Sequence, residues 1–536
     1  MKKHLFHLLT GTLLALSFSL VLSLRADDIV PPPAPETPKQ TIAPILPPPP
    51  LAQVKQEETD AKANQFKDWN FLVYMCNNNN LHQFGVQNFR QMVKVGSTPY
   101  LNILLQMDEY GEKEIMRFFI EQNNPIVIEN QSNTATSFSG TPTNLFEFAQ
   151  WGIKGYPSQK TCLVLWNHGA GIKDPQIWGR MLTKWRDKLF EFNKKTGLLE
   201  LNRKLANGKR TMDVMLEELK KEEERGIAFN DVSETYLTNE DLKLGLENIC
   251  KDLLGGKKID VLAMDACHMA MVEIASQIKT AANFMVASEE VEPGAGYDYV
   301  NVLSPFATQT LDSEALARYI VFCYENEYDN TMGDYTQSAV NLAYTTDLEK
   351  AISNLSLQLI DLMTKGGNST VKTLRQIRFS HILSTEFIDN DYIDLGHFLK
   401  SLSTQAEEYS TNNDKWISFF SSEKPAVRDI WKKIHEAAVD CLAILNKMII
   451  ANAAGKNLSE ATGLAIYFPT TSIHQSYYRT EFAKATEWPN FLKKFTRSKK
   501  GKEAAMPITI PQPVVEQPII EQASTKHVKT KKVKAA

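Results

Sequence analysis

Two apolar runs in this chain stop abruptly at residues that can carry out chemistry. The run in TCLVLWNHGAG, residues 161–171, stops at His168 and a glycine, and IDVLAMDAC, residues 259–267, ends in a carboxylate, an alanine and a cysteine. Such runs are typical of buried parallel strands. Because the carboxyl ends of parallel strands meet at one rim of a sheet, neighbouring strands would bring His168 and Cys267 together. The pattern predicts a cysteine nucleophile with a histidine partner, and hence a hydrolase.

The rest of the chain alternates between strand and helix patterns, which predicts an α/β fold. Strands are expected at residues 69–76, 101–107, 115–121, 284–288, 339–343 and 463–469. Helices are expected at residues 83–93, 143–151, 269–280, 315–327 and 430–450, and from the capping pattern at 238–241 to about residue 254. The loop at residues 289–299 follows one of these strands and should face the same rim as His168 and Cys267.

The N-terminus has the layout of a secretory signal. Lys2 and Lys3 precede an apolar stretch from about residue 8 to residue 24, which predicts a signal peptide over residues 1–26. An uncleaved membrane anchor is the competing interpretation, because the apolar stretch is long for a signal. Residues 27–66 are rich in proline and then polar, as in a linker, and the Lys-rich tail at 496–536 should be disordered.

The net charge and the cysteine pattern limit which partners and cofactors are expected. The formal net charge of −4 is small for 536 residues, so no nucleic-acid partner is expected. The six cysteines form neither a disulfide framework nor the spacing of a zinc site, and Cys267 differs from those inside apolar runs because it ends its run. No metal or other cofactor is predicted, and the sequence leaves calcium dependence open.

Six segments, taken in order, carry a family resemblance. They are WNFLVYMCNNNNL, LVLWNHGAG, LTNEDL, VLAMDACHMAMVE, ASEEVEPGAGYDY and GLAIYFP. This set resembles the clostripain family of cysteine peptidases, in the caspase-like and gingipain-like clan. The resemblance implies a peptidase domain over residues 67–495 with a caspase-like α/β sandwich. Its mainly parallel central sheet would be flanked by helices, with extra helical and strand elements at the C-terminal side.

The resemblance matches His168 and Cys267 to the family's catalytic dyad. A thiolate attacks an amide carbonyl, and a nearby imidazole can lower the pKa of the thiol and protonate the leaving amine. By the same resemblance, the backbone amides of Gly169 and Cys267 would form an oxyanion hole. A glycine required only for the turn is the alternative, and it is compatible with both roles.

Asp265, two residues before the cysteine, occupies the place that lines the specificity pocket in this clan. A carboxylate there would pair with Arg or Lys, so the sequence predicts cleavage after Arg, or after Lys. A strand-end Asp that caps the next helix is the alternative. Glu289 and Glu290 are further candidates for substrate binding, and Glu292 could add negative potential, although solvated loop carboxylates are commoner.

Two positions depart from the family pattern. His268 stands where an apolar residue is expected, and we expect its side chain to point away from Cys267. The turn at residues 77–80 lacks the acidic residue often found there, which weakens the transfer of a metal or structural role to it.

Residues 178–225 are dense in Lys and Arg and read as an inserted helical hairpin between the two motifs. Family resemblance implies a single chain that is cut between the motifs after a basic residue. We hypothesise self-cleavage within this insertion; a stable surface hairpin is the alternative. The candidate processing residues are Lys209, Arg210, Lys220, Lys221 and Arg225.

Together these features predict an exported cysteine endopeptidase in the periplasm, cell envelope or medium. Its partners would be peptides or proteins with Arg or Lys before the cleaved bond, and it would be a monomer or a processed two-chain form. It would have no stable membrane span if the signal is cleaved. Two alternatives stay open: a catalytically silent binding protein on the same fold, and a thiol hydrolase of non-peptide amides.

Overall fold

The computed structural model describes residues 65–108, 114–132, 139–173, 190–193, 198–201, 227–230, 233, 235–411 and 425–497. The predicted signal peptide at residues 1–26 lies outside the described residues. So do most of the linker at 27–66, of the insertion at 178–225 with its processing candidates, and of the tail at 496–536. No helix in the described ranges is long and apolar enough to cross a membrane.

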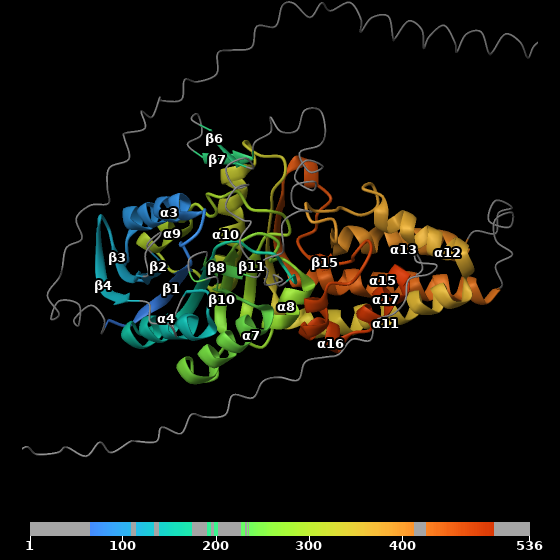
Figure 1. The fold of residues 1–536 in the computed structure, drawn as a ribbon, viewed down its shortest axis with the longest axis horizontal. Coiled ribbons are helices and arrows are strands. Elements are labelled where there is room, and N and C mark those ends of the chain that lie inside the picture. Colours follow the sequence, from blue (N-terminus) through green and yellow to red (C-terminus); the bar gives the residue numbers. More distant parts are fainter. Residues whose placement is uncertain are drawn as a thin grey trace, which may run out of the picture. The chain divides into compact units, whose positions relative to one another are not determined.

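The described residues contain a nine-stranded sheet in the order β14-β12-β11-β10-β5-β1-β2-β3-β4 (Figure 1). Its strands are β1 (Lys67–Met75), β2 (Leu101–Asp108), β3 (Glu114–Glu121), β4 (Asn124–Ser132), β5 (Ser158–Trp166), β10 (Ile259–Asp265), β11 (Ala282–Ala287), β12 (Thr336–Asn341) and β14 (Ile449–Ala454). Neighbours from β2 to β11 pair in parallel. Antiparallel pairs form both edges. The mainly parallel central sheet predicted from the sequence is confirmed.

Both faces of the sheet are buried, which explains the continuous apolar runs. Along β1, Phe71 and Val73 face one core while Leu72 and Tyr74 face the other. One core takes side chains from α3 (His82–Val95), α9 (Tyr299–Leu303) and α10 (Ser313–Tyr328). The other takes side chains from α4 (Pro142–Gly155), α7 (Asn239–Asn248) and α8 (Val272–Ile278). Helices therefore cover both faces (Figure 1).

Two helices begin at caps that the local sequence supplies. The Thr238 hydroxyl accepts a hydrogen bond from the backbone amide of Asp241 at 3.0 Å, so the capping pattern at 238–241 is confirmed as the start of α7. Thr141 caps α4 in the same way, with Pro142 in the first turn. These two helices pack against each other on the same face of the sheet.

The C-terminal part adds helices and a separate two-stranded ribbon, as expected for the fold class. Its helices are α11 (Thr345–Lys365), α12 (Gly367–Phe379), α13 (Leu395–Thr411), α15 (Pro425–Met448), α16 (Glu481–Ala485) and α17 (Trp488–Arg497). The ribbon, β13 (Tyr392–Asp394) with β15 (Ala465–Tyr467), is antiparallel and lies outside the large sheet. The last predicted strand therefore exists, and it pairs with β13.

Two helices differ from the sequence prediction in where they begin or end. The helix expected at 269–280 begins only at Val272, because the backbone before it bonds to β15 and to Ser288. The helix expected at 430–450 ends at Met448, where β-branched residues start the edge strand β14.

Within the predicted helical insertion, the described residues form the strands β6 (Phe190–Asn193) and β7 (Leu198–Leu201), which pair antiparallel. Short apolar runs fit both the helical period of about 3.6 residues and the strand period of two, so the sequence of this segment does not distinguish helix from strand. A second small pair, β8 (Ile227–Asn230) with β9 (Thr235–Leu237), follows the insertion.

Candidate active site

The strands β5 and β10 are adjacent, parallel and in register at their carboxyl ends. Trp166 and Asp265 are their last register partners, and the amide of Asn167 donates to the carbonyl oxygen of Asp265 at 3.2 Å. His168 follows two residues after Trp166, and Cys267 follows two residues after Asp265. The two strands are therefore neighbours, which is the condition under which the sequence brings both residues to one rim, and they lie at equivalent positions there.

The two motifs touch through Gly169. A Cβ atom at this position would collide with the carbonyl oxygen of Cys267 and would lie 3.0 Å from Cγ of Met269. Only glycine lets the loop after β5 approach the loop after β10 so closely. The backbone of Gly169 therefore lies directly against the backbone of Cys267.

The imidazole of His168 is bonded to the turn that follows β1. Its Nε2 lies 2.6 Å from Oδ1 of Asn80, and the side chain is half-buried. An amide oxygen is an acceptor only, so Nε2 carries the proton and Nδ1 is the accepting nitrogen. Asn80 thus fixes the orientation and the tautomer of His168.

Two asparagines next to this contact, Asn167 and Asn79, bond the backbone segments that surround it. Asn167 donates from Nδ2 to the carbonyl oxygen of Phe229 at 2.8 Å and also to that of Cys76. Asn79 reaches the same two carbonyl oxygens, each at 3.0 Å. The turn at 77–80 is therefore a structural support for the rim, built from amides in place of the acidic residue.

The thiol of Cys267 accepts a contact from the backbone amide of Glu292, at 3.3 Å from nitrogen to sulfur. Cys267 keeps some contact with solvent. Even so, the protein packed around the sulfur, followed by the charges of Glu292 and Glu290, raises the pKa of the thiol to about 12. In this state the sulfur is protonated at neutral pH.

Asp265 is buried beside the nucleophile and does not cap the next helix. Its Oδ2 accepts hydrogen bonds from the backbone amide of Tyr297 at 3.2 Å and from the hydroxyl of Tyr299 at 2.9 Å. The N-cap position of α8 is Met271, and no side chain, that of Asp265 included, caps this helix, so the capping alternative is wrong. Burial raises the pKa of Asp265, and burial followed by the Asp265 charge raises that of Glu292 well above its usual range. The two carboxyls therefore act as one pair.

The carboxylates of Glu289 and Glu290 are occupied by the C-terminal part of the chain. Glu289 Oε2 accepts from the amide of Gly463 at 3.1 Å, and Glu290 Oε2 accepts from the amide of Ile388 at 3.0 Å. Glu292 is different, because its Oε1 accepts from Gln337 while its backbone contacts the Cys267 sulfur. Of the three glutamates, Glu292 is the one beside Asp265 and Cys267.

His268 points toward the C-terminal ribbon. Its Nδ1 lies 2.9 Å from the carbonyl oxygen of Glu289, and its ring meets the ring of Tyr392 edge-on at 5.5 Å. Burial lowers the pKa of this imidazole. These contacts confirm that its side chain is directed away from the sulfur of Cys267. Within the described part of the chain, no group of three or more His, Cys, Asp or Glu side chains could hold a metal ion.

Two residues at this rim contact His168 or Cys267 in ways that the sequence interpretation did not assign. Asn80 follows β1, the neighbour of β5, so the strand-end rule that found His168 would also have found it. Glu292 lies in a segment with three glutamates, all of them buried, and no sequence pattern distinguishes which one pairs with Asp265.

A thiol and an imidazole at one rim of a mainly parallel sheet define the groups of a cysteine hydrolase. A model of the clostripain family matches residues 73–206 and 211–495. The chain therefore belongs to the clostripain family, and it is a cysteine-type peptidase. No curated protein sequence matches it.

Similar solved structures are C11 cysteine proteases. One is a secreted C11 protease from Bacteroides thetaiotaomicron in complex with an irreversible peptide inhibitor; it is 14% identical, covers 79% of this chain and 99% of that chain, and has a TM-score of 0.46. Another is an inactive zymogen C11 protease from Parabacteroides distasonis, which is 14% identical, covers 78% of this chain and 98% of that chain, and has a TM-score of 0.45.

Proposed function

We propose that this peptidase cleaves peptide bonds after Arg, or after Lys, with Cys267 as the nucleophile and His168 as its acid–base partner. The register of β5 and β10 carries the proposal, because it brings both residues to matching positions at one rim. The contact between Gly169 and the backbone of Cys267 supports an oxyanion hole formed by their two amides.

The protonated thiol defines the order of the first steps. His168 takes the proton from the Cys267 sulfur through Nδ1 as the sulfur bonds to the carbonyl carbon, and the amides of Gly169 and Cys267 stabilise the negative oxygen. The imidazolium then gives this proton to the leaving amine as the C–N bond breaks. Water hydrolyses the resulting thioester, with His168 accepting a proton from the water, and the thiol is restored.

Specificity for a basic side chain rests on Asp265 and its partner Glu292. Two carboxyls in close contact cannot both ionise easily, so the pair carries about one negative charge at neutral pH. A guanidinium would replace the tyrosine and amide hydrogens as a partner for Asp265, and its planar fork favours Arg over Lys. Glu289 and Glu290 are assigned a structural role, because backbone amides already occupy them.

The activity is tested with fluorogenic peptides that carry Arg, Lys or a neutral residue before the reporter. Cys267→Ala and His168→Ala should each remove cleavage, while Cys441→Ala, a buried thiol in α15, should retain it. An intact wild-type protein that cleaves none of these peptides, whatever its reaction with thiol reagents, would favour a silent binding protein or a hydrolase of other amides.

Basic specificity is tested separately by Asp265→Asn. Its expected effect is a loss of kcat/KM for Arg and Lys peptides of about a hundredfold, with little change for any neutral peptide that is cleaved. Glu290→Gln, which alters a carboxyl bonded to the C-terminal part, serves as the matched control. An unchanged preference for basic peptides in Asp265→Asn would remove this residue from the substrate site.

Export and self-cleavage complete the proposal. The Lys2/Lys3 start and apolar stretch support a signal peptide, and the basic candidates at Lys209, Arg210, Lys220, Lys221 and Arg225 support a cut within the insertion. Wild type and Cys267→Ala are compared on a denaturing gel. Two fragments in wild type and one chain in the variant are expected, and equal patterns would exclude self-processing.

A further inference from the structure

The ribbon of β13 and β15 touches both catalytic loops at once. Ala465 in β15 donates its amide to the carbonyl oxygen of Ala270 at 2.8 Å, three residues after Cys267. Tyr392 in β13 donates its hydroxyl to the carbonyl oxygen of Ala170 at 2.6 Å, two residues after His168. The ribbon therefore bonds the loop that follows each member of the proposed dyad.

The ring of Tyr392 also faces the loop of the nucleophile. It is fully buried, and it meets the ring of His268, the residue after Cys267, edge-on at 5.5 Å. At Gly171, which has a φ of +60°, an added Cβ would lie 3.0 Å from the carbonyl oxygen of His268 and 3.1 Å from the Tyr392 hydroxyl. The loops after His168 and Cys267 and the hydroxyl of Tyr392 are thus packed at one point.

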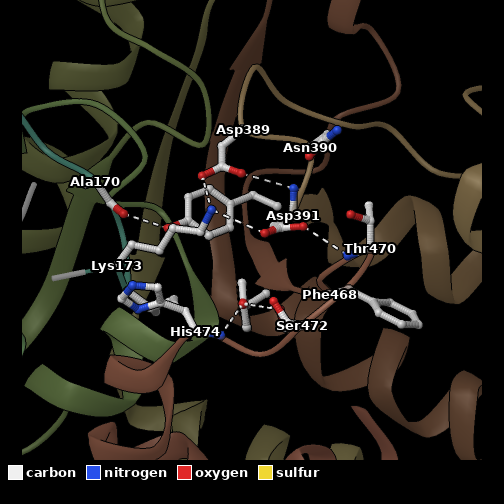
Figure 2. A network of polar contacts seen from close by, with 12 residues as sticks. Ala170, Lys173, Asp389, Asn390, Asp391, Phe468, Thr470, Ser472 and His474 are labelled. Carbon is white, nitrogen blue, oxygen red and sulfur yellow. Dashed lines mark hydrogen bonds and ion pairs between the residues drawn. The ribbon is translucent and has the colours of Figure 1, made fainter. Parts of the chain in front are cut away.

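Lys173 lies over the ring of Tyr392 and forms ion pairs with two aspartates. Its Nζ lies 2.7 Å from Asp389 and 3.3 Å from Asp391, as Figure 2 shows, and 5.4 Å from the centre of the Tyr392 ring. Asp391 is itself held by the backbone amide of Thr470 at 2.9 Å. A lysine this buried is stable only with such partners, so the pairing fixes the chain just after the His168 loop to the segment that leads into β13.

We propose that Tyr392 is a positioning residue for the dyad, and that Lys173 with Asp389 holds it between the two catalytic loops. The inference rests on the proposed roles of His168 and Cys267. Because Tyr392 bonds one loop and packs on the other, it sets the separation across which the thiol proton is transferred. Transfer and attack are sensitive to such placement: a displacement of about 1 Å can cost a hundredfold in rate.

The competing view is that Tyr392 only packs the ribbon against the sheet. Tyr392→Phe separates the two, because it keeps the ring and removes only the hydroxyl that bonds Ala170. Tyr477→Phe is the matched control: this tyrosine is buried in the same part of the chain, and its hydroxyl has no hydrogen-bond partner among the described residues. Both variants are to be measured for kcat, KM and melting temperature on an Arg peptide, beside His168→Ala.

The expected result is that Tyr392→Phe lowers kcat about tenfold and changes KM by less than about twofold, since Asp265 and Glu292 are untouched. Tyr477→Phe should retain the wild-type kcat. A drop in melting temperature equal in both variants, with equal kcat, would overturn the inference.

Lys173→Met gives an independent reading, because it keeps the aliphatic stem and removes the charge that pairs with Asp389. It should also lower kcat, and its effect should add little to that of Tyr392→Phe in the double variant, because both act through one contact. Fully additive losses would overturn the second half of the inference. If His168→Ala keeps full activity, the dyad itself is wrong and the inference falls with it; an inactive His168→Ala beside a fully active Tyr392→Phe would overturn the inference alone.

Discussion

The side-chain oxygen of Asn80 lies 2.6 Å from Nε2 of His168. Asn80 follows β1, His168 follows β5 and Cys267 follows β10, and these three strands are consecutive in the sheet. One rim of the sheet therefore receives an amide, an imidazole and a thiol from adjacent strands. The amide fixes the imidazole with Nδ1 as the accepting nitrogen, which is the state a general base requires.

Asn80→Ala should lower kcat/KM by about tenfold to a hundredfold, because His168 loses the partner that fixes its tautomer and orientation. Asn80→Asp should keep the contact but place a charge beside the ring. A carboxylate stabilises the imidazolium and raises its pKa, so the limb of the pH–rate profile that reports His168 should move to higher pH. Asn124→Ala, at an exposed hairpin turn, is the control. Wild-type rates and pH profile in both Asn80 variants would contradict this role.

The strand-end rule is enough to place His168 and Cys267 on the same rim of the sheet. His168 and Cys267 end their apolar runs in sequence, and a parallel sheet with adjacent strands brings such ends to one rim. The alternation of buried runs with helical patterns likewise predicts the α/β class, and it does not give the order of the strands in the sheet. Those features depend on local sequence and on a topology with few alternatives.

The rest of the site depends on contacts that sequence spacing does not encode. Tyr392 lies more than a hundred residues after Cys267 in a short strand with no distinctive pattern, yet it bonds the loop of His168. Three glutamates occur within four positions, but only the folded chain shows that Glu289 bonds Gly463 while Glu292 faces Cys267. The period along the insertion was ambiguous for the same reason, because short apolar runs fit both strand and helix.

Gly169→Ala should reduce kcat by about a hundredfold or more. The added methyl collides with the backbone oxygen of Cys267, which cannot yield as a flexible side chain would, so the amide proposed for the oxyanion hole must move. Gly155→Ala is the matched control, because an added Cβ there meets nothing within 4 Å. Steady-state kinetics with an Arg peptide measures both variants. Comparable activity in the two would exclude Gly169 from the oxyanion hole.

The sulfur of Cys267 should react as a protonated thiol, and not as a thiolate, at neutral pH. Because the pKa of Cys267 is raised to about 12, first by burial and then by Glu292, its alkylation by iodoacetamide should rise with pH through the range 6–9 without a plateau. Glu292 is itself neutral over this range, because its own pKa is raised well above the usual value, so Glu292→Gln should leave the alkylation rate nearly unchanged. Mass spectrometry of the Cys267 peptide follows the rate, with buried Cys441 as the internal reference. A plateau below pH 7 would instead indicate a preformed thiolate.

Glu273 should make the protein less stable as pH rises. This buried glutamate in α8 accepts the backbone amide of Tyr467 at 3.0 Å, and burial raises its pKa from 4.5 to about 8. The folded state therefore holds a proton that the unfolded chain releases, so its stabilising contribution is complete below pH 4.5 and is lost as pH rises through 8. Glutamine keeps an oxygen for Tyr467 and has no proton to lose.

Glu273→Gln should thus gain stability over the parent protein as pH rises, by roughly 4 kcal/mol at pH 9 relative to pH 4.5. Urea unfolding measures this in a Cys267→Ala background, which prevents self-digestion. Glu314→Gln, an exposed partner of Arg318, controls for the loss of a charge and should show no such gain. Suppose that the unfolding free energies of the two variants differ from that of the parent by the same amount across this pH range. Glu273 would then be ionised in the folded protein, and it would not join α8 to the ribbon as a neutral carboxyl.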